Sequence, residues 1–495
     1  MKDKAKTKER SVRVKRKPNI VEALSAVIVL LVIFFFGSLA DLSAPALIGI
    51  SLCWVVFIGW RCGYSWEEME KYTAEKIKSA APAMSVLIAV GFLLGSWMYS
   101  GTIPMFIYYG VQLVSEKWIL VSAFALCAIF STCTGTSWGS AATAGITMMG
   151  IATAMPNVNI AAVAGACYTG AIFGDKLSPL SDTTILAALS TKNDIFDHIK
   201  HMSKTVIPAA VIGVAVYLVM GISASTTGTG LPENTLQLLS TLDSVFKWNI
   251  LVLLPLVIVV YGAVTKKPST VVMMISAVVA LLIGMFYQGF ELADGVTALY
   301  SGFNLEMVEG ARPGFIAAEA GEDAMTLLNR GGLSSMLKSF ILIYICFYFA
   351  GIMEQIGAIE VLLGKLLQSV KTRFTLILAT AVSVIILVAI GGSSSLALIL
   401  TGEMYNEKYK EMGLSTLNLS RTMEDFGTGM AGFIPWSGSG VYYPSVLGVP
   451  ISAYLPYCFM SYAVWVIALV YAMTGICMKP LEADAELKES EGAEA

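Results

Sequence analysis

The stretch GAIFGDKLSPLSDTTILAA, residues 170–188, places charged side chains and a proline inside a long apolar part of the chain. Asp175, Lys176 and Asp182 lie on either side of Pro179. A charged side chain at the bilayer centre costs about 2.5–3.5 kcal/mol even on lenient scales, so such residues usually face a cavity or an ion pathway. The proline and glycines break the helix and free backbone groups, which a bilayer tolerates only inside protein or around water. The stretch therefore predicts a polar site on a broken transmembrane helix.

The composition of the whole chain is typical of a polytopic membrane protein. Hydrophobic residues make up 56% and charged residues 14% of the 495 residues, and the mean hydropathy is +0.73. Apolar runs long enough to span a bilayer recur along the chain, including 20–39, 44–60, 83–100, 206–221, 250–264, 269–285, 333–353 and 453–473. We expect about fourteen hydrophobic segments, some broken or re-entrant. The predicted fold class is an all-α polytopic membrane protein.

Positive charges predict how the chain lies in the membrane. Basic residues crowd positions 2–17 and acidic residues crowd positions 482–494, and we expect both tails to be cytoplasmic and unfolded. Basic segments that we place inside are 61–78, 192–204, 266–267 and 365–373. Segments that we place outside are 101–117, 221–249 and 303–332. The result is a multi-pass protein with both termini in the cytoplasm.

The chain is similar to itself at an offset of 256 residues (357 − 101). This offset aligns Gly101 with Gly357, Gln112 with Gln368, Gly135 with Gly391, Ser137 with Ser393, Pro179 with Pro435 and Ser181 with Ser437. We expect the register to stay constant over this range. Because charge places 101–117 outside and 357–373 inside, the two repeats would be inverted. Inverted repeats with interrupted helices are how many secondary transporters build a midplane site that opens alternately to each side.

This organisation predicts seven segments. They are a basic cytoplasmic arm (1–18), an N-terminal transmembrane hairpin with a cytoplasmic segment (19–80), the first inverted repeat (81–222), connecting transmembrane segments and external loops (223–332), the second inverted repeat (333–450), a C-terminal transmembrane helix (451–478) and an acidic cytoplasmic tail (479–495). The paired helix breaks would be residues 179–181 and 435–437.

Two segments rich in small polar residues belong with these breaks. TGTSWGSAATAG, residues 134–145, is paired by the repeat with 390–401, which contains GGSSS at 391–395. Hydroxyl and carbonyl oxygens suit a hard cation such as sodium. Close helix packing is the alternative for any single serine, because small residues generally line helix interfaces. Candidate ligands from these segments are Thr136, Ser137, Ser393 and Ser394.

The stretch NLSRTMEDFGTGMAGFIPWSGSG, residues 418–440, supplies further candidates. Arg421 and Glu424 have i, i+3 spacing, which fits an ion pair at a helix end as well as a functional role. Glu424 and Asp425 precede a glycine-rich apolar run, so at least one of them is expected inside the membrane. The sequence leaves open which one faces the site. Thr428 and Ser437 complete the candidates of this stretch.

Several function classes are not favoured by the sequence. The chain has no Walker A or dinucleotide motif, so we expect neither a nucleotide-driven pump nor a cofactor. His198 and His201 lie in a charged stretch, and we interpret them as solvated loop residues rather than as a zinc site or part of a hydrolase triad. Paired helix breaks suit alternating access better than a channel pore. We predict that the protein is not an enzyme and has no nucleic-acid partner.

Long motif strings give a more specific assignment. The strings are GxWxxSGTIPxxxYYG at 95–110, TGTSWGS at 134–140, FGDKLSPLSDTT at 173–184, and LSRTMEDFGT with IPWSGSG from 419 onward. In this order they resemble the NhaC-type sodium/proton antiporter family of the ion transporter superfamily. The resemblance implies a homodimer in a prokaryotic cytoplasmic membrane, with a scaffold domain, a mobile transport domain and elevator-type movement. It also implies that the 173–184 and 424–437 regions line the substrate site between two re-entrant hairpins.

The expected mechanism is competition between sodium and protons for Asp175 and Asp182, assisted by Ser181 and Thr183. In one version of this mechanism, Lys176 neutralises Asp175 permanently, and Asp182 alone exchanges sodium for protons. The family also contains malate/lactate exchangers and amino-acid carriers. Ser437, where asparagine is common in the family, and the small tip at 391–395 would widen the pocket for such an organic solute, with Lys176 or the hydroxyl cluster binding its carboxylate. The alternative function is therefore sodium- or proton-coupled transport of a small organic acid or amino acid.

Overall fold

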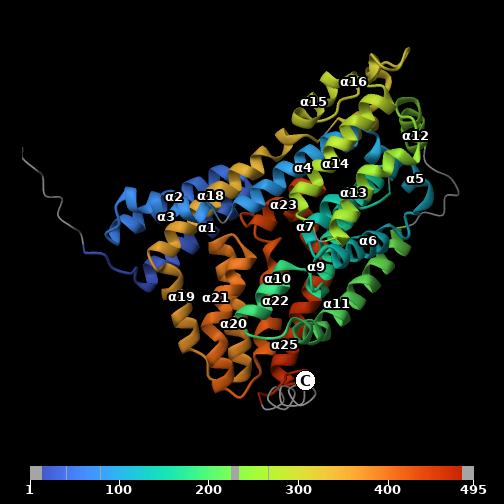
Figure 1. Ribbon diagram of the computed structural model, residues 1–495. Coiled ribbons are helices and arrows are strands. Elements are labelled where there is room, and N and C mark those ends of the chain that lie inside the picture. The colour runs from blue at the N-terminus through green and yellow to red at the C-terminus, as the bar shows by residue number, and fades with distance from the viewer. Residues whose placement is uncertain are drawn as a thin grey trace, which may run out of the picture.

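The computed structural model describes residues 14–481 except 41, 79, 156, 225–232, 266 and 330, and its elements are helices (Figure 1). Within these residues the extended pairing is one isolated bridge, between Leu414 and Pro480. The predicted all-α fold class is confirmed. Most of the expected basic arm (1–13) and acidic tail (482–495) lies outside the described residues.

The membrane spans are fewer than the roughly fourteen hydrophobic segments expected. In the described part of the chain six spans are long and apolar enough, formed by α1 (Ile20–Leu39), α2 (Ala44–Arg61), α11 (Ile195–Ala224), α14 (Ser269–Ile283) with η3 (Gly284–Gln288), η5 (Leu333–Met336) with α18 (Leu337–Gln355), and α20 (Arg373–Gly391). Three bent pairs raise the number to nine, namely α4 (Ala81–Tyr99) with α5 (Thr102–Leu113), α12 (Glu233–Val245) with η2 (Ile250–Leu253) and α13 (Leu254–Val264), and α24 (Ile451–Tyr454) and η6 (Leu455–Tyr457) with α25 (Phe459–Thr474). The difference arises because the apolar runs near the proline and glycine breaks fold as short helices.

The first hairpin tip is the turn of a helical hairpin formed by residues 119–153, and it touches the break in the helix that follows. Helix α6 (Ile119–Thr134) stops at Gly135, whose φ of 69° turns the chain back into α7 (Ser137–Ser140), the π-helix η1 (Ala141–Gly145) and α8 (Ile146–Thr153). The Ser140 hydroxyl donates to the carbonyl of Cys127 at 2.7 Å, so the returning limb lies against α6. Helix α9 (Ile160–Leu177) then breaks before α10 (Asp182–Ser190). Gly135 packs against Leu180 in this break.

The second half repeats this arrangement. Helix α20 ends at Gly392, which has φ 66°, and the chain returns through α21 (Ser394–Glu411). Helix α22 (Thr416–Ala431) breaks before α23 (Gly438–Leu447). The N–H of Gly438 donates to the carbonyl of Gly392 at 2.8 Å. Each hairpin tip therefore touches the helix break of its own half.

The register of the two halves agrees at the breaks and slips at the tips. Ser181 and Ser437, 256 residues apart, both cap a helix by accepting a hydrogen bond from the backbone N–H three residues on. At the tips the left-handed glycines are Gly135 and Gly392, which are 257 residues apart. The expected pairing of Gly135 with Gly391 is wrong, because Gly391 is the last residue of α20 and the tip needs the left-handed turn one residue later.

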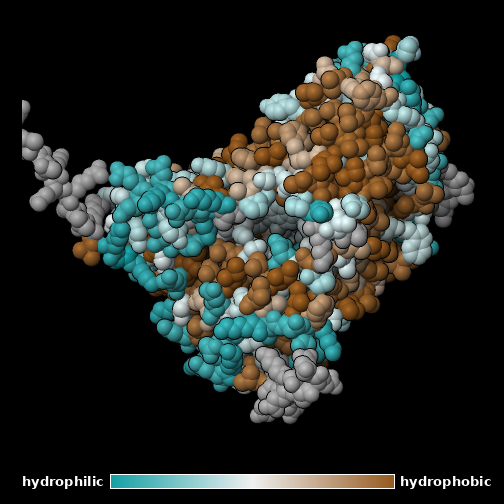
Figure 2. Space-filling view, in the orientation of Figure 1, coloured by the Kyte–Doolittle hydropathy of each residue, from teal (hydrophilic) through white to brown (hydrophobic). Residues whose placement is uncertain are grey.

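The helices form two groups (Figure 1). One contains α1, α2, α4, α5, α12–α14 and α18 together with α3 (Trp66–Lys78), α15 (Leu292–Ser301), α16 (Glu306–Glu309), η4 (Ala317–Glu319), α17 (Glu322–Leu328) and α19 (Ala358–Gln368). The other contains α6–α11 and α20–α25, with α6 packed on α9, α11 on α25 and α20 on α22. Figure 2 shows apolar surface over α13 and α14 and hydrophilic surface over α3. The apolar surface is the part of the molecule suited to lipid contact.

The described residues at both ends of the chain have partners on the rest of the molecule. Arg16 donates to Glu22 at 2.6 Å, Lys15 pairs with Glu68 at 2.7 Å, and Lys17 pairs with Glu360. Near the other end, the N–H of Leu481 donates to the carbonyl of Gly413 at 3.0 Å. Residues 14–17 of the basic arm thus have no regular secondary structure but pair with the helices, whereas the acidic positions 482–494 lie outside the described residues.

Candidate ion-binding site

The two hairpin tips and the two helix breaks enclose one large cavity of about 1120 Å³. Its lining includes residues 134–139, Asp175, Pro179, Leu180, Asp182, Thr183, residues 392–396, Thr428, Gly438 and Ser439. The cavity also reaches Tyr72, Glu75 and Lys76 of α3 and Lys267 before α14. These last residues belong to the segments 61–78 and 266–267, which the positive charges predict to be cytoplasmic.

Asp175 is a buried carboxylate in the last turn of α9, with 3% of the residue exposed. The Ser137 hydroxyl, from the first hairpin tip, donates to Asp175 Oδ2 at 2.9 Å. Asp175 Oδ1 has no hydrogen-bond partner among the described residues. The last turn of a helix also presents free carbonyls and the negative end of the helix dipole. This combination of oxygens favours a cation.

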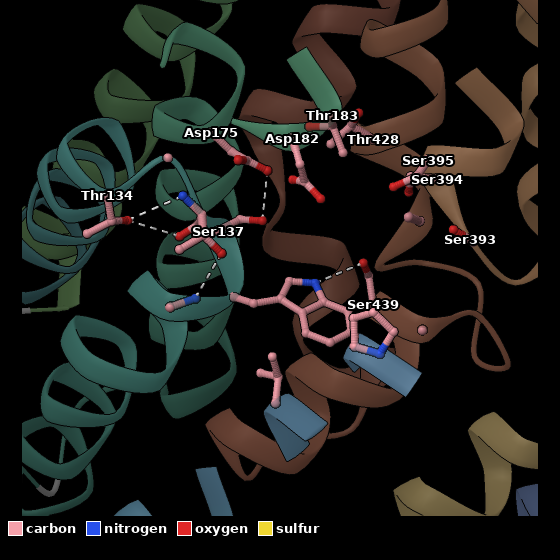
Figure 3. A pocket seen from close by; sticks show the side chains of 18 of the residues that line it. Thr134, Ser137, Asp175, Asp182, Thr183, Ser393, Ser394, Ser395, Thr428 and Ser439 are labelled. Atoms are coloured by element: carbon pink, nitrogen blue, oxygen red, sulfur yellow. Dashed lines mark hydrogen bonds between the residues drawn. The ribbon is translucent and has the colours of Figure 1, made fainter. Parts of the chain in front are cut away.

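Asp182 reaches the same cavity from the other side of the break (Figure 3). It is the first residue of α10, where the positive end of the helix dipole stabilises a carboxylate, and its side chain is exposed to the cavity. Ser181 is buried as the N-cap of α10, and its hydroxyl lies 3.0 Å from Thr183 Oγ1. Thr183 lines the cavity, whereas Ser181 shapes the turn that positions Asp182.

Hydroxyl groups from the second half face the two aspartates (Figure 3). Ser393, Ser394 and Ser395 line the cavity at the second hairpin tip, and Thr428 lines it from α22. From the first tip, Thr136 lines the cavity and caps α7 by accepting from the N–H of Gly139 at 3.3 Å. The cavity is thus bordered by carboxylate, hydroxyl and backbone oxygens, which are the ligand types of hard cations.

Ser437 lies beside the cavity lining and bonds to the backbone. It is buried, and its hydroxyl accepts from the N–H of Gly440 at 2.9 Å and donates to the carbonyl of Ala431. The cavity is lined by its neighbours Gly438 and Ser439. Ser437 therefore holds the start of α23, as Ser181 holds the start of α10.

Lys176 points away from Asp175. Its Nζ donates to the carbonyl of Glu424 at 2.6 Å and lies 3.5 Å from Asp425 Oδ1, and the residue is 1% exposed. Successive helical residues are about 100° apart around the axis, so Asp175 faces the cavity while Lys176 faces α22. The prediction that Lys176 neutralises Asp175 or binds an organic carboxylate is wrong in this structure.

Glu424 and Asp425 are both fully buried. Glu424 Oε2 lies 2.9 Å from His198 Nε2, and Glu424 Oε1 accepts from the Thr428 hydroxyl at 3.4 Å. Asp425 pairs with Lys176 instead. Glu424 is therefore the carboxylate linked to the cavity, through Thr428.

The ion pair between Arg421 and Glu424, one of the two interpretations of their spacing, is not formed in the described structure. Arg421 is buried and donates to the carbonyl of Cys477 at 2.9 Å. The guanidinium is thereby directed to the chain after α25, while Glu424 turns toward His198. The spacing alone could not show this, because each side chain finds a partner on another helix.

The interpretation of His198 and His201 as solvated loop residues is also wrong. Both are buried on α11, with 0% and 3% exposure. His198 binds Ser420 and Glu424, and His201 Nε2 lies 3.1 Å from Asn418 Oδ1. A signal was present in the sequence, since positions 198, 201 and 205 share one helix face and the charged positions 197, 200 and 204 share another.

Comparison with known proteins identifies the family. The model of the Na+/H+ antiporter family matches residues 170–476. The Na(+)/H(+) antiporter NhaC of Alkalihalophilus pseudofirmus is 34% identical over 412 residues, which cover 83% of this chain and 86% of that protein. The chain belongs to the Na+/H+ antiporter family. The predicted family resemblance is confirmed.

Other relatives of this antiporter family member differ in what they carry. The malate-2H(+)/Na(+)-lactate antiporter of Bacillus subtilis is 31% identical over 93% of this chain and 96% of that protein. Among solved structures, that of the Alcanivorax borkumensis YdaH transporter covers 82% of this chain and 89% of its own, with 16% identity and a TM-score of 0.32. The part of this antiporter family member that the family model matches contains both aspartates, the second hairpin and α22.

Proposed function

We propose that this chain exchanges sodium for protons, and that the two cations compete for Asp175 and Asp182. The observation that carries the proposal is that both carboxylates reach one cavity from the two ends of one helix break. Asp175 also keeps one oxygen without a partner in the described structure. Each carboxylate binds either a proton covalently or sodium by coordination, and this mutual exclusion couples the two fluxes.

The charge balance around the cavity supports cation binding. Asp175 and Asp182 line the cavity at the helix break, and Glu424 and Asp425 are buried behind it. Lys176 and Arg421 are the permanent cations beside this buried pair, whereas Lys76 and Lys267 line the cavity together with Glu75, on residues of α3 and the segment before α14. Asp175 and Asp182 have no ion-pair partner among the described residues, which favours their occupancy by protons or sodium.

The position of the cavity suits alternating access. One wall comes from the two hairpins and two broken helices, and the other includes residues of α3, α4, α13, α14 and α18. In the proposed cycle the group α6–α11 with α20–α25 moves against the other helices and carries the site across the membrane, as in an elevator. Protons then move inward and sodium outward. The proposal includes inverted repeats, a homodimer and a location in the cytoplasmic membrane with both termini inside.

The proposed exchange is tested with purified protein in liposomes that contain a pH-sensitive dye. A sodium gradient without organic solute should change the internal pH for wild type and fail to do so for Asp182→Asn. Asp197→Asn on α11 is a matched control, because it makes the same substitution outside the cavity lining. A sodium-driven pH change of full size in Asp182→Asn would contradict the proposed site.

An organic solute is a second candidate, favoured by the size of the cavity. A volume of about 1120 Å³ exceeds the needs of one ion and lies just above the usual range of small-molecule sites, which is roughly 300–1,000 Å³. The similarity to a malate/lactate antiporter agrees with this candidate. Uptake of labelled malate, lactate and amino acids with and without a sodium gradient separates it from simple sodium/proton exchange.

A further inference from the structure

A buried histidine and a buried glutamate form a close pair behind the cavity. His198 on α11 and Glu424 on α22 are both fully buried, and His198 Nε2 lies 2.9 Å from Glu424 Oε2. A carboxylate and an imidazole at this distance share a proton, because either group can hold it while the other accepts the hydrogen bond. The pair is therefore a site for one exchangeable proton.

On one side this pair connects to the cavity. Glu424 Oε1 accepts hydrogen bonds from Thr428 Oγ1 and Thr184 Oγ1, each at 3.4 Å. Thr428 lines the cavity, and the single hydroxyl proton of Thr184 is placed between Glu424 Oε1 and the carbonyl of Asp175, which lies 3.2 Å away. Glu424 is thus one hydroxyl group away from the proposed ion site.

On the other side the pair connects to the protein surface. His198 Nδ1 lies 2.8 Å from Ser420 Oγ, and Asn193 Nδ2 donates to Ser420 Oγ at 3.3 Å. Asn193 is half-buried in the turn between α10 and α11, a segment that the positive charges place in the cytoplasm. Ser420 itself is fully buried, and its hydroxyl donates to the carbonyl of Leu417 at 3.1 Å. Hydrogen bonds therefore link the cavity to this turn, with Asn193 as the donor in the outermost bond.

We infer that Glu424, His198 and Ser420 form a proton relay between the cavity and the cytoplasmic surface. In the release step, Glu424 Oε2 gives its proton to His198 Nε2, and His198 Nδ1 gives its proton to Ser420 Oγ. The Ser420 hydroxyl then turns away from the carbonyl of Leu417, to which it donates in this structure, and releases its own proton to water that enters at the turn holding Asn193. The relay loses one proton and one positive charge in total. The inference rests on the proposed sodium/proton exchange, and it separates the proton route from the sodium ligands.

Other charged and titratable groups surround the relay. They are Asp175 and Lys176 on α9, Asp182 on α10, His201 and Lys204 on α11, Arg421 and Asp425 on α22, and Tyr471 and Cys477 beside Arg421. Lys176 and Arg421 are directed to other partners, the first to Asp425 and the second to the carbonyl of Cys477. The direct hydrogen-bond partner of Glu424 that can take up its proton is therefore His198.

The relay is tested by comparing two reactions in the same liposomes. Exchange of labelled sodium for unlabelled sodium requires the ion site and the movement but no net proton transfer. Sodium-driven proton flux requires the relay as well. His198→Gln should reduce proton flux by about tenfold or more and leave sodium/sodium exchange within about twofold of wild type.

Two further variants make the comparison decisive. Ser420→Ala removes the outer link and keeps the His198–Glu424 pair, so it decides the question if His198→Gln does not fold, and it should show the same selective loss. His201→Gln is the matched control, because it is the same substitution one helical turn away, at a histidine bonded to Asn418. It should leave both reactions within about twofold of wild type.

The possible results separate the two claims. Equal losses of both reactions in His198→Gln and Ser420→Ala, or no loss in either, would overturn the relay and leave sodium/proton exchange standing. A folded wild-type protein that moves no protons would overturn the proposed function and the relay together.

Discussion

Gly135, at the tip of the first hairpin, packs so closely on Leu180 that a Cβ atom at position 135 would lie 2.5 Å from Leu180 Cβ. At the second tip the corresponding glycine is Gly392, where the nearest atom to an added Cβ is 3.8 Å away. Both glycines have left-handed backbone conformations. The two tips therefore share a backbone requirement, while the steric requirement is confined to the first tip.

This difference predicts unequal effects of the same substitution. Gly135→Ala and Gly392→Ala should each lose about 1–2 kcal/mol of stability from the left-handed backbone. Gly135→Ala should in addition push Leu180 and the break that carries Asp182, and so reduce sodium-driven proton flux by about tenfold or more. Thermal unfolding and flux of both variants check this. Equal flux in the two variants would contradict the account.

The Ser137–Asp175 hydrogen bond predicts an effect on sodium affinity. Ser137→Ala removes a hydroxyl that orients Asp175 in the cavity, and a lost hydrogen bond to a charged group weakens binding by about 1.5–3 kcal/mol. The sodium concentration for half-maximal exchange should rise by about tenfold or more. Sodium titration of the exchange rate measures this.

A matched control is Ser131→Ala. Ser131 is also buried and donates to the α9 backbone, at the carbonyl of Ala171, but it does not line the cavity. This variant should lose stability and keep its sodium dependence. If the two serine variants shifted the sodium dependence equally, Ser137 would have no special role at the site.

The Lys176–Asp425 pair predicts a rescue. Lys176→Met leaves a buried carboxylate without its cation, which costs about 3–5 kcal/mol. The double variant Lys176→Met/Asp425→Asn removes both charges and should recover a large part of this loss. Thermal unfolding in detergent of the two single variants and the double variant provides the measurement. A double variant no more stable than Lys176→Met would contradict a direct pairing.

The sequence predicted the parts of the fold around the candidate site that depend on local signals. Pro179 and the charges at 175 and 182 located the broken helix, and small residues located both hairpin tips. The direction of Lys176 and Arg421 could not be predicted, because it depends on which helix packs beside each side chain. His198 was missed because charged neighbours at 197 and 200 hid a buried helix face.

The central claim is that sodium and protons compete for the carboxylates of the cavity, and equilibrium binding of labelled sodium to purified protein tests it most directly. The account predicts that the apparent Kd rises as the pH falls, by up to about tenfold per pH unit where one proton displaces one sodium ion. Asp182→Asn should weaken the binding and flatten this pH dependence. Sodium binding whose Kd is the same from acidic to alkaline pH would contradict the account.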